Sequence, residues 1–329
     1  VWTEPKLDAM QKAIVKAFPG RDALVFDRSA DYKRIVARVE NASNPPVYYL
    51  VDFGKGTADI IGEAYPGLAD TALGTLEFLS YRTVDGYEIP AYLTLPPGRE
   101  PKNLPLVVFP HGGPYARDDA GFDWWAQFLV SRGYVVLQPQ FRGSTGFGAE
   151  LYRAGHKQWG RGMQEDISAG VRYLVAKGLV DPARVCIVGA SYGGYAALAG
   201  AAFTPDLYAC AASINGIADI PHMSGFIREK GGDDSSWRDR IGDPSDKDVI
   251  AFSPSRSIDT IKAPILLVHG ANDTVVPVSQ SENFARLLEQ KGKHHTYVVL
   301  PGEDHWLSSS DSRLKLLEAL DAFLATHLN

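Results

Sequence analysis

From residue 104 to the end of the chain, short apolar runs alternate with helical patterns. Six runs are rich in Val, Ile and Leu, namely 104–109, 134–138, 185–188, 209–214, 265–268 and 296–300. Runs of this kind are typical of strands that are buried on both faces of a parallel sheet. Amphipathic stripes such as Ile167, Val171 and Leu174 lie between them. The alternation predicts an α/β fold with an open, mostly parallel twisted sheet and helices on both faces.

A different pattern precedes this region. An amphipathic helix is expected over 3–18, followed by four β-like runs at 23–27, 34–40, 47–53 and 58–61. Four strands in about 40 residues resemble one blade of a β-propeller. Two further strands, 76–82 and 87–95, flank the hairpin signal Asp85-Gly86. We therefore predict a partial β-propeller remnant with an N-terminal helix over 1–75 and an α/β domain over 76–329.

Composition narrows the possible functions. The chain has 33 Lys and Arg against 39 Asp and Glu, a net charge of −6, which disfavours broad nucleic-acid binding. No apolar run reaches the roughly 18 residues of a membrane span. The two cysteines, Cys186 and Cys210, are too few for a disulfide framework and are expected to be buried free thiols. No metal-ligand spacing occurs, so neither a metal nor a cofactor is expected.

The strongest chemical signal is the run Gly189-Ala190-Ser191-Tyr192-Gly193-Gly194. It follows the predicted strand over 184–188 and precedes a predicted helix over 196–203. In this context G-x-S-x-G forms a nucleophile elbow, a turn so tight that glycine is needed on both sides of the serine. We therefore expect Ser191 to be a catalytic nucleophile.

A serine nucleophile needs a base and an orienting acid, and in this fold class they follow it in the order acid, histidine. Asp273 comes just after the strand over 265–268, and His305 comes just after the strand over 296–300. Both would lie at the sheet edge where open α/β folds bind ligands. His305 is expected to be the general base and Asp273 its orienting carboxylate. Glu303 and Asp304, which adjoin His305, remain alternative acids.

Two glycine-rich blocks follow earlier strands at the same edge. The turn His111-Gly112-Gly113-Pro114 offers the N–H of Gly113 as an oxyanion donor beside the N–H of Tyr192. His111 itself is expected to pack under the site. In the block 141–148, Arg142 could hold a substrate carbonyl or carboxylate, or it could brace neighbouring loops.

Together these blocks resemble the prolyl oligopeptidase family of serine peptidases, most closely its acylaminoacyl-peptidase-like branch. The matching stretches are 85–96, 111–114, 142–148, 189–194, 269–277 and 301–305. The resemblance implies an α/β-hydrolase fold, the triad Ser191, Asp273 and His305, and the oxyanion donors Gly113 and Tyr192. Some relatives use a tyrosine hydroxyl at the position of His111, which favours two backbone donors here. It also implies a specificity pocket, for which the candidates are Met223, Phe226, Trp237 and Val276. The family further carries an N-terminal propeller of about seven blades, and residues ~20–65 resemble the end of one.

The expected function is hydrolysis of peptide or acyl-aminoacyl bonds through an acyl-enzyme, and the alternative is a carboxylesterase acting on small acyl esters. A pseudoenzyme would lack a triad member, and none is missing. The chain begins Val-Trp-Thr without Met, so a fragment of a longer protein is expected. A cytoplasmic location is expected, with a removed secretion signal left open. The sequence gives no indication of oligomeric state.

Overall fold

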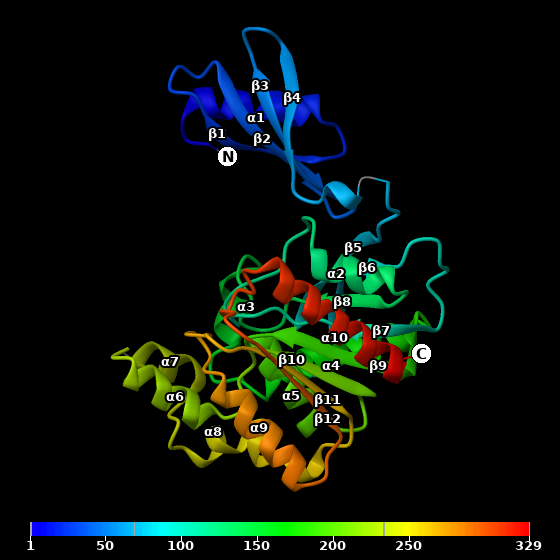
Figure 1. The fold of residues 1–329 in the computed structure, drawn as a ribbon, viewed down its shortest axis with the longest axis vertical. Helices are drawn as coiled ribbons and strands as arrows, with labels where there is room; N and C mark the ends of the chain where they lie inside the picture. Colours follow the sequence, from blue (N-terminus) through cyan, green and yellow to red (C-terminus); the bar gives the residue numbers. More distant parts are fainter. Residues whose placement is uncertain (1, 69, 233, 329) are drawn as a thin grey trace.

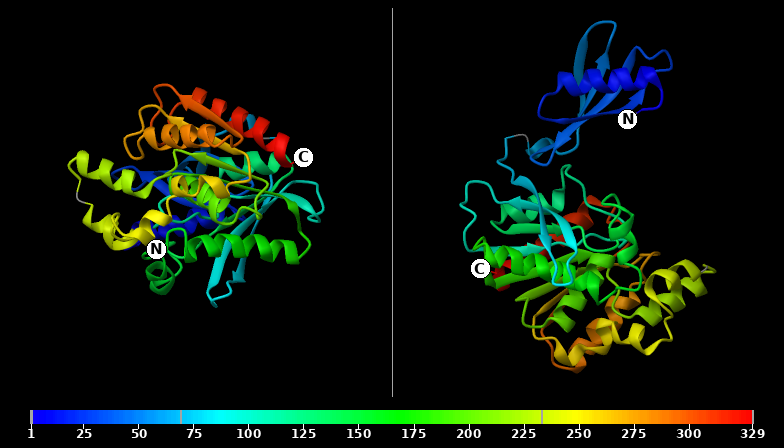
Figure 2. Two further views of the ribbon diagram at one scale, coloured as in Figure 1. Left: turned by 90° about the horizontal axis from the view of Figure 1, so that it is seen from below. Right: turned by 180° about the vertical axis from the view of Figure 1, so that it is seen from behind.

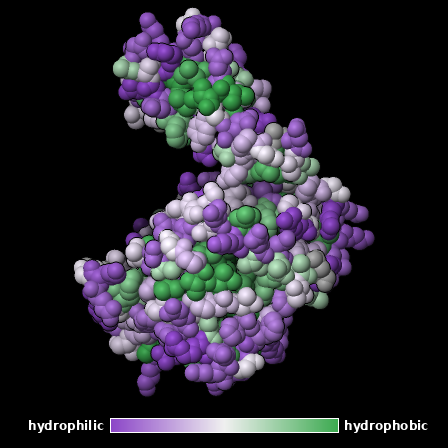
Figure 3. All heavy atoms as spheres, in the orientation of Figure 1, coloured by the Kyte–Doolittle hydropathy of each residue, from purple (hydrophilic) through white to green (hydrophobic). Residues whose placement is uncertain are grey.

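The computed structural model describes residues 2–68, 70–232 and 234–328. It has a small N-terminal unit, blue in Figure 1, joined by a thin connection to a larger α/β body. The space-filling view shows a hollow between the two parts on one side (Figure 3).

The N-terminal unit is one helix packed on a four-stranded antiparallel sheet of order β1-β2-β3-β4, so the four predicted strands are confirmed. Its elements are α1 (Pro5–Ala17), β1 (Asp22–Arg28), β2 (Arg34–Asn41), β3 (Asn44–Asp52) and β4 (Thr57–Glu63). Leu7 and Ile14 of α1 are buried against alternate residues of β1 and β2. Leu24 and Phe26 of β1 alternate with the buried Ala23 and Val25 and are exposed, so the other sheet face is left open.

The larger body is built on an eight-stranded sheet of order β12-β11-β10-β9-β7-β8-β6-β5. After a short 3₁₀ turn, η1 (Pro66–Leu68), its strands are β5 (Thr75–Arg82), β6 (Glu88–Leu95), β7 (Leu104–Val108), β8 (Val135–Pro139), β9 (Val180–Ala190), β10 (Cys210–Ile214), β11 (Ile265–Gly270) and β12 (His295–Leu300). The β5–β6 and β6–β8 pairs are antiparallel, and the others are parallel. This is the predicted α/β-hydrolase sheet.

Helices cover both faces of this sheet (Figures 1 and 2). The helices are α2 (Trp124–Ser131), α3 (Ala149–Ala154), α4 (Gly162–Ala176), α5 (Tyr192–Phe203), α6 (Ile220–Glu229), α7 (Ser235–Ile241), α8 (Lys247–Ala251), α9 (Ser279–Gln290) and α10 (Ser310–Leu328), with the 3₁₀ turns η2 (Pro254–Arg256) and η3 (Ile258–Thr260). One core lies under α2 and α10, and the other lies under α4, α5 and α9. Among the described helices, none has the length and apolar character needed to cross a membrane.

The free-thiol expectation for Cys186 and Cys210 is wrong, because the two residues form a disulfide. They lie directly opposite each other on the neighbouring parallel strands β9 and β10, with Cα atoms 4.7 Å apart. That separation is within the range that a disulfide can bridge. The pairing depends on the strand register, which the spacing of the cysteines along the chain does not reveal.

Candidate active site

Ser191 lies in the turn between β9 and α5, with φ 58° and ψ −119°, a backbone conformation that is rare for a residue with a side chain. The flanking glycines explain how the turn closes. A Cβ on Gly189 would overlap the backbone of Gly193, and a Cβ on Gly193 would overlap the carbonyl oxygen of Pro110. Helix α5 begins at Tyr192, four residues before the predicted start, so its first N–H groups lie beside the serine.

His305 and Asp273 are joined by a hydrogen bond of 2.6 Å from Nδ1 to Oδ2. The other oxygen of Asp273, Oδ1, accepts from the backbone N–H groups of Val275 and Val276, both at 2.8 Å. Burial opposes ionisation of Asp273, but hydrogen bonds from His269, His305 and Val276 outweigh it and hold its pKa well below the usual range. With Nδ1 donating to a carboxylate, Nε2 of the neutral ring is left as the basic nitrogen.

The two alternative acids organise the histidine loop instead. Glu303 is buried, and its carboxylate accepts from the backbone N–H groups of Asp304, Ser308 and Ser309. Asp304 accepts from the N–H of Trp306 and the hydroxyl of Ser308. The ring of His305 is thus bonded to Asp273, as predicted. Ser191, Asp273 and His305 follow the carboxyl ends of β9, β11 and β12, which lie at one edge of the parallel sheet.

The predicted oxyanion donors, Gly113 and Tyr192, come from the glycine turn after β7 and from the start of α5. A Cβ on Gly112 would be 3.5 Å from Cβ of Ser191, so the glycine turn after β7 packs against the elbow. Gly113 has φ 118°, a conformation that favours glycine. The N–H of Tyr192 is in the first turn of α5, where backbone N–H groups have no partner within the helix. The side chain of Tyr192 is in the core with 1% exposed, so only its backbone faces the site.

His111 is a structural residue, as expected. Its Nδ1 lies 2.7 Å from the carbonyl of Gly112, and its Nε2 lies 2.8 Å from Oγ of Ser144. Because a carbonyl only accepts, Nδ1 carries the proton and Nε2 accepts from the serine hydroxyl. The ring stacks on Phe141, and burial lowers the pKa of His111 to about 4, so the ring is uncharged at neutral pH.

The described contacts of Arg142 are those of a residue that braces neighbouring loops. Its guanidinium is paired with Asp85 at 2.6 Å and with Asp166 at 2.7 Å, and it donates to the carbonyl of Gly162. The side chain is only 6% exposed, and the guanidinium lies over the ring of Tyr87, with Cζ 4.4 Å from the ring centroid. The guanidinium therefore joins the β5–β6 hairpin to α4, and its donors are taken up within the protein.

The four predicted pocket residues belong to one apolar region. Met223 and Val276 are part of the core that contains Tyr192, and Phe226 and Trp237 pack against that core. Val276 also belongs to the acid loop, since its N–H donates to Asp273. None of the described contacts joins these four residues to Ser191. In this respect they do not differ from ordinary core residues.

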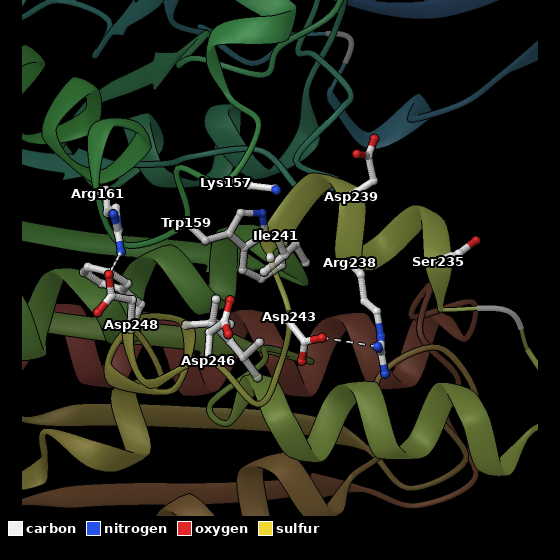
Figure 4. A pocket seen from close by; sticks show the side chains of 14 residues that line it. Lys157, Trp159, Arg161, Ser235, Arg238, Asp239, Ile241, Asp243, Asp246 and Asp248 are labelled. Carbon is white, nitrogen blue, oxygen red and sulfur yellow. Dashed lines mark hydrogen bonds and ion pairs between the residues drawn. The ribbon is translucent and has the colours of Figure 1, made fainter.

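A cavity of about 570 Å³ lies between α6, α7 and α8 (Figure 4). Its apolar lining is Trp159, Ile220, Ile241, Val249 and Phe252, and charged side chains surround these residues. The ring of Trp159 stands edge-on to the buried ring of Tyr192, with ring centroids 4.6 Å apart. Ile220, Ile241, Val249 and Phe252 lie in the segment 215–252, from which three of the predicted pocket residues come, whereas Trp159 was not predicted because it comes from a loop about 60 residues before α6 along the chain.

Comparison with known proteins agrees with this geometry. Residues 120–329 match the model of the prolyl oligopeptidase family. The chain is 33% identical over 341 residues to dipeptidyl aminopeptidase BIII of Pseudoxanthomonas mexicana, covering 98% of this chain and 48% of that protein. It is 26% identical to acylamino-acid-releasing enzyme 1 of Oryza sativa subsp. japonica, covering 76% of this chain and 33% of that protein.

Solved structures show the same architecture. A puromycin-hydrolyzing peptidase of Mycobacterium tuberculosis matches with a TM-score of 0.81 and 31% identity, over 90% of this chain and 46% of that one. An acylaminoacyl peptidase of Pyrococcus horikoshii matches with a TM-score of 0.80 and 25% identity, over 94% and 50%. The chain spans about half the length of the first curated relatives it matches. By its family match, its fold and its site, the chain belongs to the prolyl oligopeptidase family.

Proposed function

We propose that the chain is a serine peptidase that cleaves peptide or acyl-aminoacyl bonds through an acyl-enzyme. The main observation in support of this proposal is the hydrogen bond between His305 and Asp273. Both residues lie at the same sheet edge as Ser191, whose backbone is strained. An orienting carboxylate, a basic imidazole and a serine elbow at one sheet edge are the parts that acyl transfer requires. No step in this chemistry needs a metal or a cofactor.

Each predicted site residue has one role in the proposed reaction. Nε2 of His305 takes the proton of Ser191 as Oγ attacks the scissile carbonyl, and Asp273 stabilises the resulting imidazolium. The N–H groups of Gly113 and Tyr192 stabilise the oxyanion. His305 then donates its proton to the leaving amine, and water releases the acyl group by the reverse sequence.

The substrate class is suggested by the relatives, whose names describe a dipeptidyl aminopeptidase, an acylamino-acid-releasing enzyme and a puromycin-hydrolyzing peptidase. An aminoacyl or N-acyl-aminoacyl group is therefore the proposed acyl part. The cavity beside Trp159 is large enough for one side chain of such a group. Its apolar residues favour an aliphatic or aromatic side chain.

A substrate panel tests the proposal. Wild type and Ser191→Ala are compared on aminoacyl, dipeptidyl and N-acyl-aminoacyl p-nitroanilides and on p-nitrophenyl esters of short acids. We expect anilide hydrolysis by wild type that is lost in Ser191→Ala. Hydrolysis of the esters alone would instead support a carboxylesterase, and no turnover of either class by folded wild type would contradict the proposal.

A further inference from the structure

Asn215 lies directly after β10, between the strand that leads to Ser191 and the strand that leads to Asp273. β10 pairs with β9 on one side and with β11 on the other. Asn215 is 1% exposed and has φ 48°, in the left-handed region that asparagine tolerates better than most residues with a side chain. Its position after β10 places it between the loops that carry Ser191 and Asp273.

The side-chain amide of Asn215 joins two other loops. Its Oδ1 accepts from the backbone N–H of Gly270 at 2.8 Å, and its Nδ2 donates to the backbone carbonyl of His305 at 3.1 Å. Because an N–H only donates and a carbonyl only accepts, these partners determine the orientation of the amide. The backbone N–H of Asn215 adds a bond to the carbonyl of Val268 at 2.9 Å.

The same turn also holds the nucleophile. The carbonyl of Ile214 accepts from the backbone N–H of Ser191 at 2.9 Å. Ile214 therefore bonds to the main chain of Ser191. Asn215 bonds to the end of β11, the strand that precedes Asp273, and to the main chain of His305. The loops around this point are closely packed, since a Cβ on Gly270 would lie 2.7 Å from the carbonyl oxygen of Asp304.

We propose that Asn215 is a positioning residue that sets the place of His305 relative to Ser191. Asp273 orients the imidazole through Nδ1, whereas Asn215 holds the main chain from which that ring projects. Both constraints are needed, because a displacement of about 1 Å between reacting groups can cost about 100-fold in rate. This inference rests on the proposed function of the triad.

The isosteric variant Asn215→Asp tests the donor. It keeps an acceptor for Gly270 but places a carboxylate oxygen against the carbonyl of His305. We expect kcat to fall by about 10–100-fold while KM changes by less than about threefold. The acid limb of the pH profile is the range in which kcat/KM falls as His305 gains a proton. This limb should also move to higher pH, because a negative charge near His305 favours the imidazolium form.

The variant Asn215→Gly tests both bonds together. Glycine accepts the positive φ of this position without strain but makes neither side-chain bond. We expect a similar fall in kcat, and no upward displacement of the acid limb, since no charge is added. Every kcat is divided by the folded fraction, which is measured by circular dichroism at the assay temperature.

Gln127→Glu is the matched control. Gln127 is also buried, and its amide also bridges two backbone segments, accepting from the N–H of Gly74 at 2.8 Å and donating to the carbonyl of Ala42 at 2.8 Å. It lies on α2, and neither of its two partners belongs to a triad loop. We expect Gln127→Glu to lower the unfolding temperature while kcat per folded molecule and the acid limb stay as in wild type.

The outcomes separate the possibilities. Folded Asn215→Asp and Asn215→Gly with wild-type kcat and pH profile would overturn the positioning role. Failure of both variants to fold would also overturn it, because the amide would then be required for the sheet edge itself. Failure of the proposed function is distinguishable, since it would show as folded wild type without turnover or as turnover that survives Ser191→Ala.

Discussion

His305 Nδ1 lies 2.6 Å from Oδ2 of Asp273, while Oδ1 of the same carboxylate is held by two backbone N–H groups of its own loop. The acid is thus fixed from one side before it orients the histidine on the other. A carboxylate held in this way keeps Nδ1 protonated and Nε2 free to accept a proton.

Replacing Asp273 by Asn should lower kcat by about 10⁴-fold with little change in KM, because the amide no longer selects the productive tautomer of His305. The matched control is Asp304→Asn, since Asp304 bonds only to its own loop in the described contacts. Steady-state kinetics on one anilide compares the two variants. Equal losses in both would contradict the assignment of Asp273 as the orienting acid.

The sequence predicted the fold because strand and helix periodicities are local properties. It also predicted that Ser191, Asp273 and His305 share one sheet edge, because each comes shortly after a strand of the parallel part of the sheet, and the ends of parallel strands share an edge. The disulfide between Cys186 and Cys210 depends on strand register, which is not a local property. The role of Asn215 was missed for a similar reason, since its partners lie 55 and 90 residues away along the chain.

Replacing Arg142 by Met should destabilise the fold rather than weaken substrate binding. The carboxylate of Asp166, which has no exposed surface, would lose its cationic partner. Breaking such a buried pair costs about 3–5 kcal/mol. Urea unfolding measures the loss, and Arg142→Met combined with Asp166→Leu should recover part of it. A raised KM with unchanged stability would instead indicate contact with the substrate.

Asp118 should make the protein less stable as pH rises. Burial and the charge of Asp123 raise the pKa of Asp118 to about 8. The folded chain therefore keeps a proton that the unfolded chain releases near pH 4, so this group lowers stability progressively between about pH 4 and pH 8.

Asp118→Asn should remove that dependence, raising the unfolding temperature at pH 8 and changing it little at pH 4. The exposed neighbour Asp119 provides the control Asp119→Asn, which should keep most of the wild-type slope. Calorimetry across this range measures both variants. If the unfolding temperature of Asp118→Asn depended on pH as it does in wild type, the carboxyl of Asp118 would be ionised in the folded protein at neutral pH.

Gly193→Ala should abolish activity, because the added Cβ would overlap the carbonyl oxygen of Pro110 and push the elbow away from the glycine turn. Gly225→Ala is the control, since Gly225 lies within α6 and a Cβ there would meet no atom within 4 Å. In α6, alanine should stabilise by about 1 kcal/mol. Normal turnover by Gly193→Ala would mean that the elbow tolerates a different backbone path.

Covalent labelling of Ser191 tests the central claim most directly. Folded wild type is treated with a fluorophosphonate, the adduct is counted by intact mass, and its position is mapped by peptide sequencing. The account predicts one adduct per chain, on Ser191, and none in a folded Ser191→Ala variant with the same circular dichroism spectrum. An adduct that persists in Ser191→Ala, or folded wild type that never reacts, would contradict it.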